Sequence, residues 1–420
     1  MSRSRHRRAT YRARRARRGP GLAKIAAAAA ILIVALVIAW GATALLATPP
    51  SPSVHATVAT EHTVSGTPLV LQPAFGAEEA VALQGSGTIA SAGPQRPSPI
   101  ASLTKVMAAL VILRDHPLRR GESGPNIPIT AADVTTYRQE LAQNDSVVAV
   151  RVGEQLSELQ ALEGALVPSG DNIIQLLASW DAGSTSAFVA KMNAYARSLG
   201  LAHTHYAGPS GVNPATVSTA TDQLRLAQLA MANPVFRHIV AMAQVNLPVA
   251  GVVYNVNADL GTDGINGIKT GWVPQGGGCF VFSATTRVNG APRSIVGAVI
   301  GVQGGTPIPT ALATAKTLVL ASKKVITTVR VPAGMTVATI TAPYGNPIRV
   351  VTASSMTLTT WQGAKIRYVL HARRFKSGSI SAGARAGTLG VELAGAQRSL
   401  PLRTTGALSG PTLSWRLMHP

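Results

Sequence analysis

The chain has 420 residues, which is enough for two domains and at least one sizeable hydrophobic core. Its 38 Lys and Arg against 17 Asp and Glu give a formal net charge of +21, and residues 1–24 hold ten of the basic residues and no acid. This basic arm precedes an apolar segment and contains one aromatic residue, Tyr11, which disfavours nucleic-acid binding.

Residues 25–47 form a run of 23 residues without a charge. At 1.5 Å per residue such a helix can cross a hydrocarbon layer of about 30 Å. The positive-inside rule then places the basic tail, residues 1–24, in the cytoplasm and the chain after Thr48 outside. We therefore expect a single-pass cell-membrane protein whose larger part faces the cell wall. The alternatives are a cleaved signal peptide, with Ala44–Ala47 as a weak cleavage site and a secreted product, and a nucleic-acid arm.

The residues outside the membrane retain a basic excess of 28 Lys and Arg over 17 Asp and Glu. Such a charge attracts anionic envelope polymers or lipid headgroups, and charge alone does not distinguish between these two partners. Residues 48–66 are rich in Pro and Ser and are expected to form an extended tether. The single cysteine, Cys279, excludes an internal disulfide, and we expect it to be buried as a small apolar residue.

Residues 67–324 mix helical and strand-like patterns. Apolar residues recur at helical spacing from Leu103 to Leu113 and Pro117 ends the run, so Ser102 is placed at a helix start with Lys105 one turn later. Ser157 and Gln160 form the capping box of a second helix. We also expect helices over 187–199, 222–231 and 309–321, and strands over 279–285 and 295–302. Strands flanking a helical block predict an α+β domain with helices packed on a mostly antiparallel sheet.

Residues 325–420 lack helical patterns. Short strand-like stretches at 337–341, 348–352, 365–371 and 388–393 are separated by Gly, Pro, Ser and Asn. This part is predicted to be a small all-β domain.

Three short motifs in the larger domain carry the chemistry. Ser102 and Lys105 are followed by Ser169-Gly170-Asp171-Asn172 and then by Lys269-Thr270-Gly271. This order indicates a serine acyl-transfer enzyme with its own lysine base. A serine hydroxyl needs a base within hydrogen-bond reach, and a lysine amine serves only when neutral. Burial and the nearby charge of Lys269 would both favour the neutral form.

Four blocks carry a family resemblance: Pro99–Lys105, Leu166–Gly170, Ser218–Asp222 and Gly267–Gly271. They resemble, in order, the blocks of the D-alanyl-D-alanine carboxypeptidase family, the low-molecular-mass penicillin-binding proteins. The likeness covers about residues 68–320. It implies the serine transpeptidase and β-lactamase-like fold and a carboxypeptidase that removes the terminal D-alanine from peptidoglycan pentapeptides. β-Lactam antibiotics are then expected as covalent inhibitors.

The same resemblance implies roles for individual residues. Ser102 would be the nucleophile, Lys105 its base, and Ser169 a proton relay to the leaving amine. Lys269 and Thr270, with Gly271 beside them, would bind the terminal carboxylate. The backbone N–H groups of Ser102 and Trp272 would form the oxyanion hole. No metal and no cofactor is needed.

The middle motif departs from the family, which usually has Ser-x-Asn where this chain has Ser169-Gly170-Asp171. A carboxylate cannot donate the hydrogen bond that an amide gives a substrate carbonyl. Either Asn172 supplies that contact or Asp171 lines the cleft as a carboxylate, paired with Lys105 or Lys269. Both residues are therefore candidates for substrate binding.

Two other functions compete with the carboxypeptidase. A β-lactamase on the same fold needs fast deacylation, for which class A enzymes use a glutamate, and no glutamate lies between Glu163 and Glu392. A non-catalytic scaffold that binds peptidoglycan would show degraded motifs, and only Asp171 points that way. His203 and His205 have metal-ligand spacing but no Cys or Glu near them in the sequence, so structural roles are expected.

Overall fold

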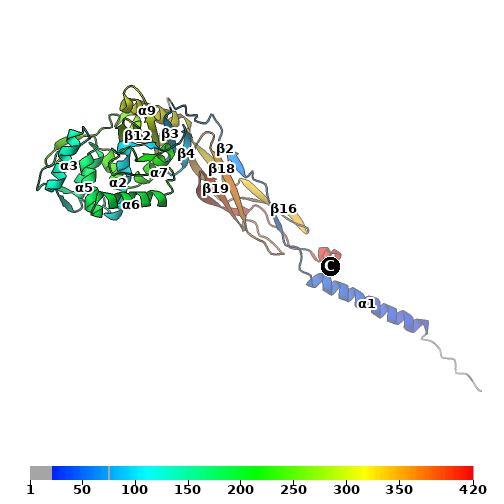
Figure 1. Cartoon of the computed structure of the whole chain (residues 1–420). Helices are drawn as coiled ribbons and strands as arrows, with labels where there is room; N and C mark the ends of the chain where they lie inside the picture. The colour runs from blue at the N-terminus through cyan, green and yellow to red at the C-terminus, as the bar shows by residue number, and fades with distance from the viewer. Residues whose placement is uncertain (1–20, 74–75, 420) are drawn as a thin grey trace, which may run out of the picture.

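The computed structural model describes residues 21–73 and 76–419. The molecule is elongated (Figure 1), with helix α1 (Leu22–Leu46) at one end, a β domain next to it and an α/β domain at the other end. The basic tail predicted for residues 1–24 falls mostly outside the described residues. The β domain therefore separates the α/β domain from α1.

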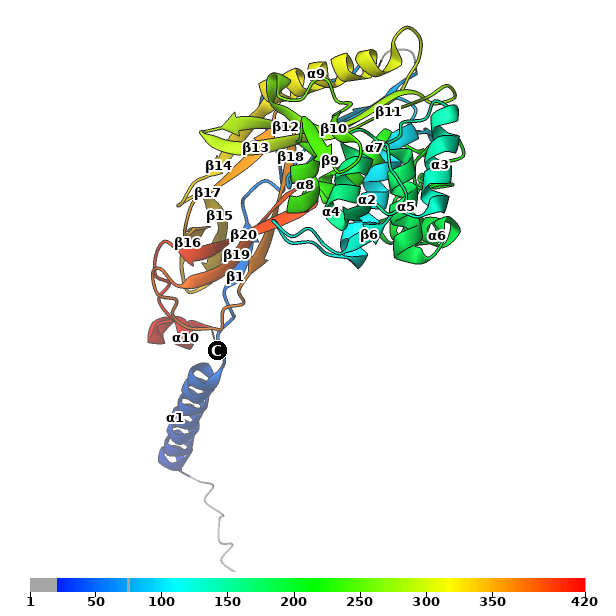
Figure 2. The same ribbon diagram turned by 90° about the vertical axis from the view of Figure 1, so that its left-hand side faces the viewer.

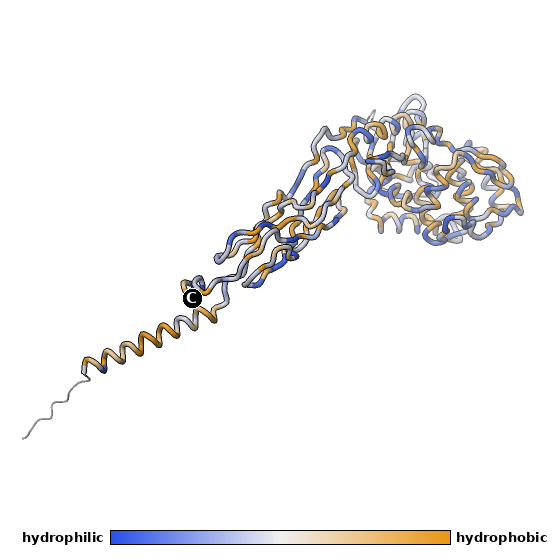
Figure 3. Tube along the Cα trace, turned by 180° about the vertical axis from the view of Figure 1, so that it is seen from behind, coloured by the Kyte–Doolittle hydropathy of each residue, from blue (hydrophilic) through white to orange (hydrophobic). Residues whose placement is uncertain are grey.

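Helix α1 has 25 residues and is long and apolar enough to cross a membrane. Of its side chains only Ala44 is buried, so the protein itself covers almost none of the apolar surface. Figure 3 shows hydrophobic colouring along most of α1, in contrast to the mixed colouring of the folded domains. An exposed apolar helix of this length fits a membrane anchor or an export signal.

The α/β domain is built on a five-stranded antiparallel sheet in the order β11-β12-β13-β3-β4. The strands are β3 (Glu78–Leu83), β4 (Gly87–Ala92), β11 (Ile265–Val273), β12 (Gly277–Val288) and β13 (Ala291–Val302). Helix α9 (Pro307–Val325) packs against β12 and β13 through Leu312 and Val319 in one apolar cluster. Because both faces of the sheet are covered, β3 is buried at every residue.

A helical block forms the rest of this domain (Figure 2). Its helices are α2 (Thr104–Asp115), α3 (Ala131–Ala142), α4 (Glu158–Leu166), α5 (Asp171–Ala182), α6 (Thr185–Ser198), α7 (Ala220–Ala230) and α8 (Pro234–Val240). Helix α2 is buried from Thr104 to Leu113 and contacts α4, α5, α6 and α7, which makes it the centre of the block. A helix surrounded on all sides must be apolar all round. Its one charged residue in this stretch, Lys105, therefore needs a specific partner.

Short elements complete the α/β domain: β5 (Ser98–Pro99), the 3₁₀ turns at Ala101–Leu103 and Thr262–Gly264, β6 (Asn126–Pro128), β7 (Gln155–Ser157), β8 (Val217–Ser218), β9 (Gln244–Leu247) and β10 (Gly251–Tyr254). The capping box predicted at Ser157 is present, because Ser157 accepts from Gln160 N–H and the Gln160 side chain accepts from Ser157 N–H. The predicted α+β class is confirmed, and Cys279 is buried as expected.

The C-terminal β domain has a seven-stranded antiparallel sheet in the order β1-β15-β16-β20-β19-β18-β2. Its later strands are β15 (Thr336–Ala342), β16 (Gly345–Thr352), β18 (Lys365–Ala372), β19 (Arg385–Leu393) and β20 (Ala396–Thr404). A separate pair, β14 (Ile326–Val331) and β17 (Met356–Trp361), joins it to α9. The short helix α10 (Leu413–Met418) ends the chain beside α1, where Arg416 donates a 3.0 Å hydrogen bond to Leu45 O.

The two edge strands of this sheet correct the expectation of a tether over residues 48–66. β1 (Ser53–Ala56) pairs with β15, and β2 (Glu61–Thr63) pairs with β18. These segments are too short to show an alternating sequence pattern. They become strands because they pair with the open hydrogen-bonding edges of strands nearly 300 residues later. The N-terminal segment thus completes the C-terminal domain.

Candidate active site

Ser102 lies in a 3₁₀ turn, Ala101–Leu103, that leads directly into α2. Ala101 has φ +50°, a left-handed conformation that is costly outside glycine and often marks functional turns. Lys105 follows one helical turn later, and its Nζ donates a 2.9 Å hydrogen bond to Ser102 Oγ. A base at this distance can take the serine proton.

Lys105 brings the first two motifs together at one fully buried amine. Its Nζ also contacts Asp171 Oδ1 at 2.6 Å, Ser169 Oγ at 3.4 Å and the Ser210 carbonyl at 3.3 Å. Ser169 has φ +67°, a left-handed conformation in the turn before α5, and its hydroxyl lies toward Lys105. No sequence pattern predicted the contact between Lys105 and the Ser210 carbonyl.

The third motif forms the opposite wall on β11, the edge strand of the five-stranded sheet. Lys269 and Thr270 are buried, and a Cβ on Gly271 would stand 2.9 Å from Ser102 N, so only glycine lets β11 approach the serine this closely. Trp272 is 49% exposed at the rim. An edge strand leaves backbone groups free for a peptide substrate.

Burial and then the charge of Lys105 lower the pKa of Lys269 to about 7, against a smaller opposing effect of Asp171. The Lys269 ammonium donates a 3.0 Å hydrogen bond to Thr270 O. A lysine with this pKa is charged below neutral pH and becomes neutral above it. An anionic group arriving from solution would stabilise the charged form.

A cleft of about 490 Å³ lies between these walls. Six of the nine predicted site residues line it: Ser102, Ser169, Asp171, Thr270, Gly271 and Trp272. Lys105 and Lys269 are buried within hydrogen-bond reach of lining residues. The structure therefore gathers eight of the nine at one place.

The ninth, Asn172, faces away from the cleft. Its Oδ1 accepts a 2.9 Å hydrogen bond from Val148 N–H, and its Nδ2 donates one of 2.9 Å to Val148 O. Both ends of the amide are thus occupied by backbone. The Asn172 amide points to Val148 rather than into the cleft because α5 starts at Asp171 and the next residue lies about 100° further around the helix.

Asp171 lines the cleft and forms an ion pair with Lys105, which is the second of the two arrangements expected from the sequence. Its other oxygen accepts a 3.1 Å hydrogen bond from Ser146 N–H, and its own N–H donates to Ser146 O at 2.6 Å. These bonds hold the loop Gln143–Ser146, which lines the cleft and was not foreseen. One carboxylate therefore fixes both the lysine and a cleft wall.

Two further acids surround this pair. Burial raises the pKa of Glu140 to about 7, helped by Asp171 and Asp145, and Gln175 donates a 2.8 Å hydrogen bond to Glu140 Oε1. Burial, then Asp171, also raises the pKa of Asp145 at the cleft. Gln175 lies one helical turn after Asp171, so the same face of α5 carries the partner of Lys105 and the partner of Glu140.

Comparison with known proteins agrees with this site. The family model described as D-alanyl-D-alanine carboxypeptidase matches residues 69–302, more than half of the chain. The chain belongs to the D-alanyl-D-alanine carboxypeptidase family. The activity that goes with the family is that of a serine-type D-Ala-D-Ala carboxypeptidase, and the match covers all three motifs.

Individual relatives extend the comparison. A D-alanyl-D-alanine endopeptidase of Pseudomonas aeruginosa is 30% identical over 61% of this chain and 77% of its own length. The crystal structure of a Streptomyces DD-transpeptidase aligns with a TM-score of 0.53 at 27% identity, over 60% of this chain and 98% of that one. Penicillin-binding protein 5 of Haemophilus influenzae has a TM-score of 0.58 at 22% identity, over 81% and 99%. That last likeness shows the fold alone, and it extends into the C-terminal β domain.

The pairing of Asp171 with Lys105 leads to a testable pH effect. In Asp171→Asn the Lys105 side chain loses the anionic partner that lies 2.6 Å from its Nζ. Because an opposite charge favours the charged form of its partner, we expect the acid limb of the acylation pH profile to move toward acid. The rate of covalent labelling by a fluorescent penicillin, followed from pH 4 to 9, measures this shift.

Asn172→Ala is the matched control for that measurement. It removes two buried backbone contacts and should lower the free energy of unfolding by about 1–3 kcal/mol, yet leave the pH profile in place. A profile that moves in Asn172→Ala and not in Asp171→Asn would contradict the assignment of the ion pair to the acylation step.

Proposed function

We propose that this protein is a membrane-anchored peptidase that removes the terminal D-alanine from peptidoglycan stem peptides through an acyl-enzyme on Ser102. The observation that carries the proposal is the 2.9 Å contact between Ser102 Oγ and Lys105 Nζ in a cleft whose far wall is Lys269-Thr270-Gly271. A substrate ending in D-Ala-D-Ala offers a carbonyl for the serine and a carboxylate for the cationic wall.

In the acylation step Ser102 Oγ attacks the carbonyl of the penultimate D-alanine while Lys105 takes the hydroxyl proton. A lysine serves as base only in its neutral form, and Lys105 Nζ lies within hydrogen-bond reach of Ser102 Oγ. Backbone N–H groups of Ser102 and Trp272 would receive the oxyanion. The proton then passes to the leaving amine through Ser169, whose Oγ lies 3.4 Å from Lys105 Nζ.

The leaving D-alanine is bound by its carboxylate in this proposal. Thr270 lines the cleft, and Lys269 beside it is charged below neutral pH and would be held charged by the bound carboxylate. A water molecule then attacks the ester on Ser102, with Lys105 again as base, and releases the shortened peptide. β-Lactams would acylate the same serine and remain attached because their deacylation is slow.

For its location we propose that α1 stays in the membrane and that both domains face the cell wall. The basic tail before α1 and the length of the apolar segment support this orientation. In this arrangement the C-terminal β domain holds the cleft away from the bilayer (Figure 1).

The direct test is D-alanine release from a pentapeptide ending in D-Ala-D-Ala, using the full chain in detergent or nanodiscs. We expect one equivalent of D-alanine per peptide and complete inhibition by stoichiometric penicillin. A tetrapeptide with one terminal D-alanine is the matched substrate control and should release none. If the chain cleaves cross-linked dimers but leaves the pentapeptide intact, it is an endopeptidase instead.

A further inference from the structure

The positive charge of this protein outside its N-terminal tail is concentrated in the C-terminal β domain. Residues 326–420 contain eleven Lys and Arg and one acid, Glu392, whereas residues 67–325 are nearly balanced with 17 basic and 15 acidic side chains. Glu392 pairs with Arg367 at 3.9 Å, and Glu61 on β2 pairs with Lys365 at 3.0 Å. The charge excess is therefore a property of one domain rather than of the chain.

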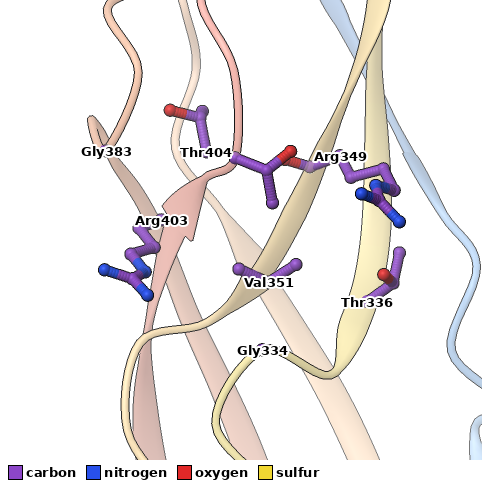
Figure 4. Close-up of a pocket in the computed structure, with 8 residues that line it drawn as sticks. Gly334, Thr336, Arg349, Val351, Gly383, Arg403 and Thr404 are labelled. Carbon is purple, nitrogen blue, oxygen red and sulfur yellow. The ribbon is translucent and has the colours of Figure 1, made fainter.

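A pocket of about 380 Å³ lies on this domain between β15, β16, β20 and the turn at Gly383. It is lined by Arg349, Arg403, Thr336 and Thr405 among others, and no acid lines it. Figure 4 shows the side chains of Arg349 and Arg403 on either side of Val351. Within residues 21–73 and 76–419 neither guanidinium has an ion-pair or hydrogen-bond partner, so ten N–H donors face solvent.

The walls of this pocket are held in place by two buried threonines on neighbouring strands. Thr352 Oγ1 accepts a 3.0 Å hydrogen bond from Met335 N–H, which fixes the turn at Gly334. Thr404 Oγ1 accepts one of 3.0 Å from Ala384 N–H, which fixes the turn at Gly383. The pocket is thus preformed, and a ligand would not have to order it.

The strand register adds a reason for an anion at this place. Arg385 on β19 lies directly opposite Arg403 on β20. Like charges directly opposite one another destabilise an antiparallel pair. Arg385 does not line the pocket, but an anion bound there beside Arg403 would offset this repulsion, and no acid lines the pocket to do so.

We propose that this pocket, the Arg349–Arg403 pocket, binds a phosphate group of an anionic polymer in the cell envelope. Guanidinium forks match the tetrahedral oxygens of phosphate with paired hydrogen bonds, and the hydroxyl of Thr336 adds a donor. Further unpaired arginines of the same domain favour a ligand with repeated charges over a single ion.

The position of the pocket favours a polymer over lipid headgroups. Ser53, close after α1, pairs with Thr341 near the end of β15, whereas Thr336 at the pocket begins that strand. At about 3.3 Å per residue the pocket lies roughly 17 Å further along the sheet. Figure 2 likewise shows β16 and β20 between α1 and the α/β domain. Binding here would hold the enzyme within an anionic layer while the cleft remains free.

The test uses the full chain in phosphatidylcholine nanodiscs and a fluorescent glycerol-phosphate oligomer as probe. We expect saturable binding by fluorescence anisotropy, and a loss of about 100-fold in affinity in Arg349→Ala/Arg403→Ala, since each charged contact is worth about tenfold. The control variant Arg373→Ala/Arg374→Ala removes the same charge outside the pocket, and we expect a loss of less than about threefold because exposed charges are screened by salt. Penicillin labelling, measured in parallel, should be unchanged in both variants.

Three outcomes would overturn the proposal. The first is no binding by the parent. The second is an equal loss in both double variants, which would mean attraction by net charge alone. The third is binding to phosphatidylglycerol vesicles that depends on Arg349 and Arg403 without binding to the oligomer, which would make the membrane the partner. A pocket variant that has also lost penicillin labelling is replaced by Arg349→Lys/Arg403→Lys, which keeps the charge but not the paired hydrogen bonds and should lose at least tenfold.

Discussion

Ser102→Ala is expected to abolish covalent labelling by penicillin and D-alanine release together. Ser102 Oγ is the hydroxyl 2.9 Å from Lys105 Nζ, in a residue that lines the cleft next to Gly271 of β11. Removing a nucleophile of this kind lowers turnover by roughly a factor of a million in comparable serine enzymes. Labelling with a fluorescent penicillin, followed by gel electrophoresis and mass spectrometry of the labelled peptide, measures the effect.

The fold should survive this substitution. Ser102 provides no cap to α2, and its one side-chain hydrogen bond, to Lys105, leaves that amine with Asp171 and the Ser210 carbonyl. We expect the free energy of unfolding to change by no more than about 1 kcal/mol. Ser169→Ala is the matched control, since it should slow acylation without removing the attachment point. Label found on another residue in Ser102→Ala would refute the assignment of the nucleophile.

Lys105→Arg is expected to lower the acylation rate by about 100- to 10,000-fold, the usual contribution of a general base. A guanidinium keeps the positive charge and the partner Asp171 but stays protonated at any ordinary pH. It therefore cannot take the Ser102 proton. The pre-steady-state rate of penicillin acylation, measured across pH, gives the effect directly.

Burial complicates this substitution, because Lys105 is fully enclosed and arginine is larger. Lys105→Met has a similar length and no charge, and it should lose acylation equally while leaving Asp171 unpaired. Thermal unfolding of both variants separates loss of the base from loss of the fold. Acylation within tenfold of the parent in either folded variant would show that Lys105 only positions its neighbours.

The pairing of Asp171 with Lys105 distinguishes the middle motif of this chain from the usual pattern of its family. A carboxylate in place of the family's usual amide holds the base and the Gln143–Ser146 loop at the same time. Burial, and then the charge of Asp171, raise the pKa of both Glu140 and Asp145. We therefore expect the pH dependence of acylation, rather than the identity of the nucleophile, to distinguish this enzyme.

Local sequence patterns by themselves determined much of this protein. The apolar run before Ala47, the capping box at Ser157 and the helical spacing from Leu103 to Leu113 each depend on neighbours within a few residues. The spacing of Ser102 and Lys105 also fixed their contact, because three residues make one helical turn. The motif order was enough to indicate the family.

Only the tertiary structure decided which residues meet across long separations. The choice between Asp171 and Asn172 depended on where α5 begins relative to Lys105, 66 residues earlier. The edge strands at Ser53–Ala56 and Glu61–Thr63 depended on open edges formed by β15 and β18. The meeting of Arg349 with Arg403 depended on the register of β16 and β20. Such contacts are set by packing and strand pairing between distant segments, for which no local pattern carries a signal.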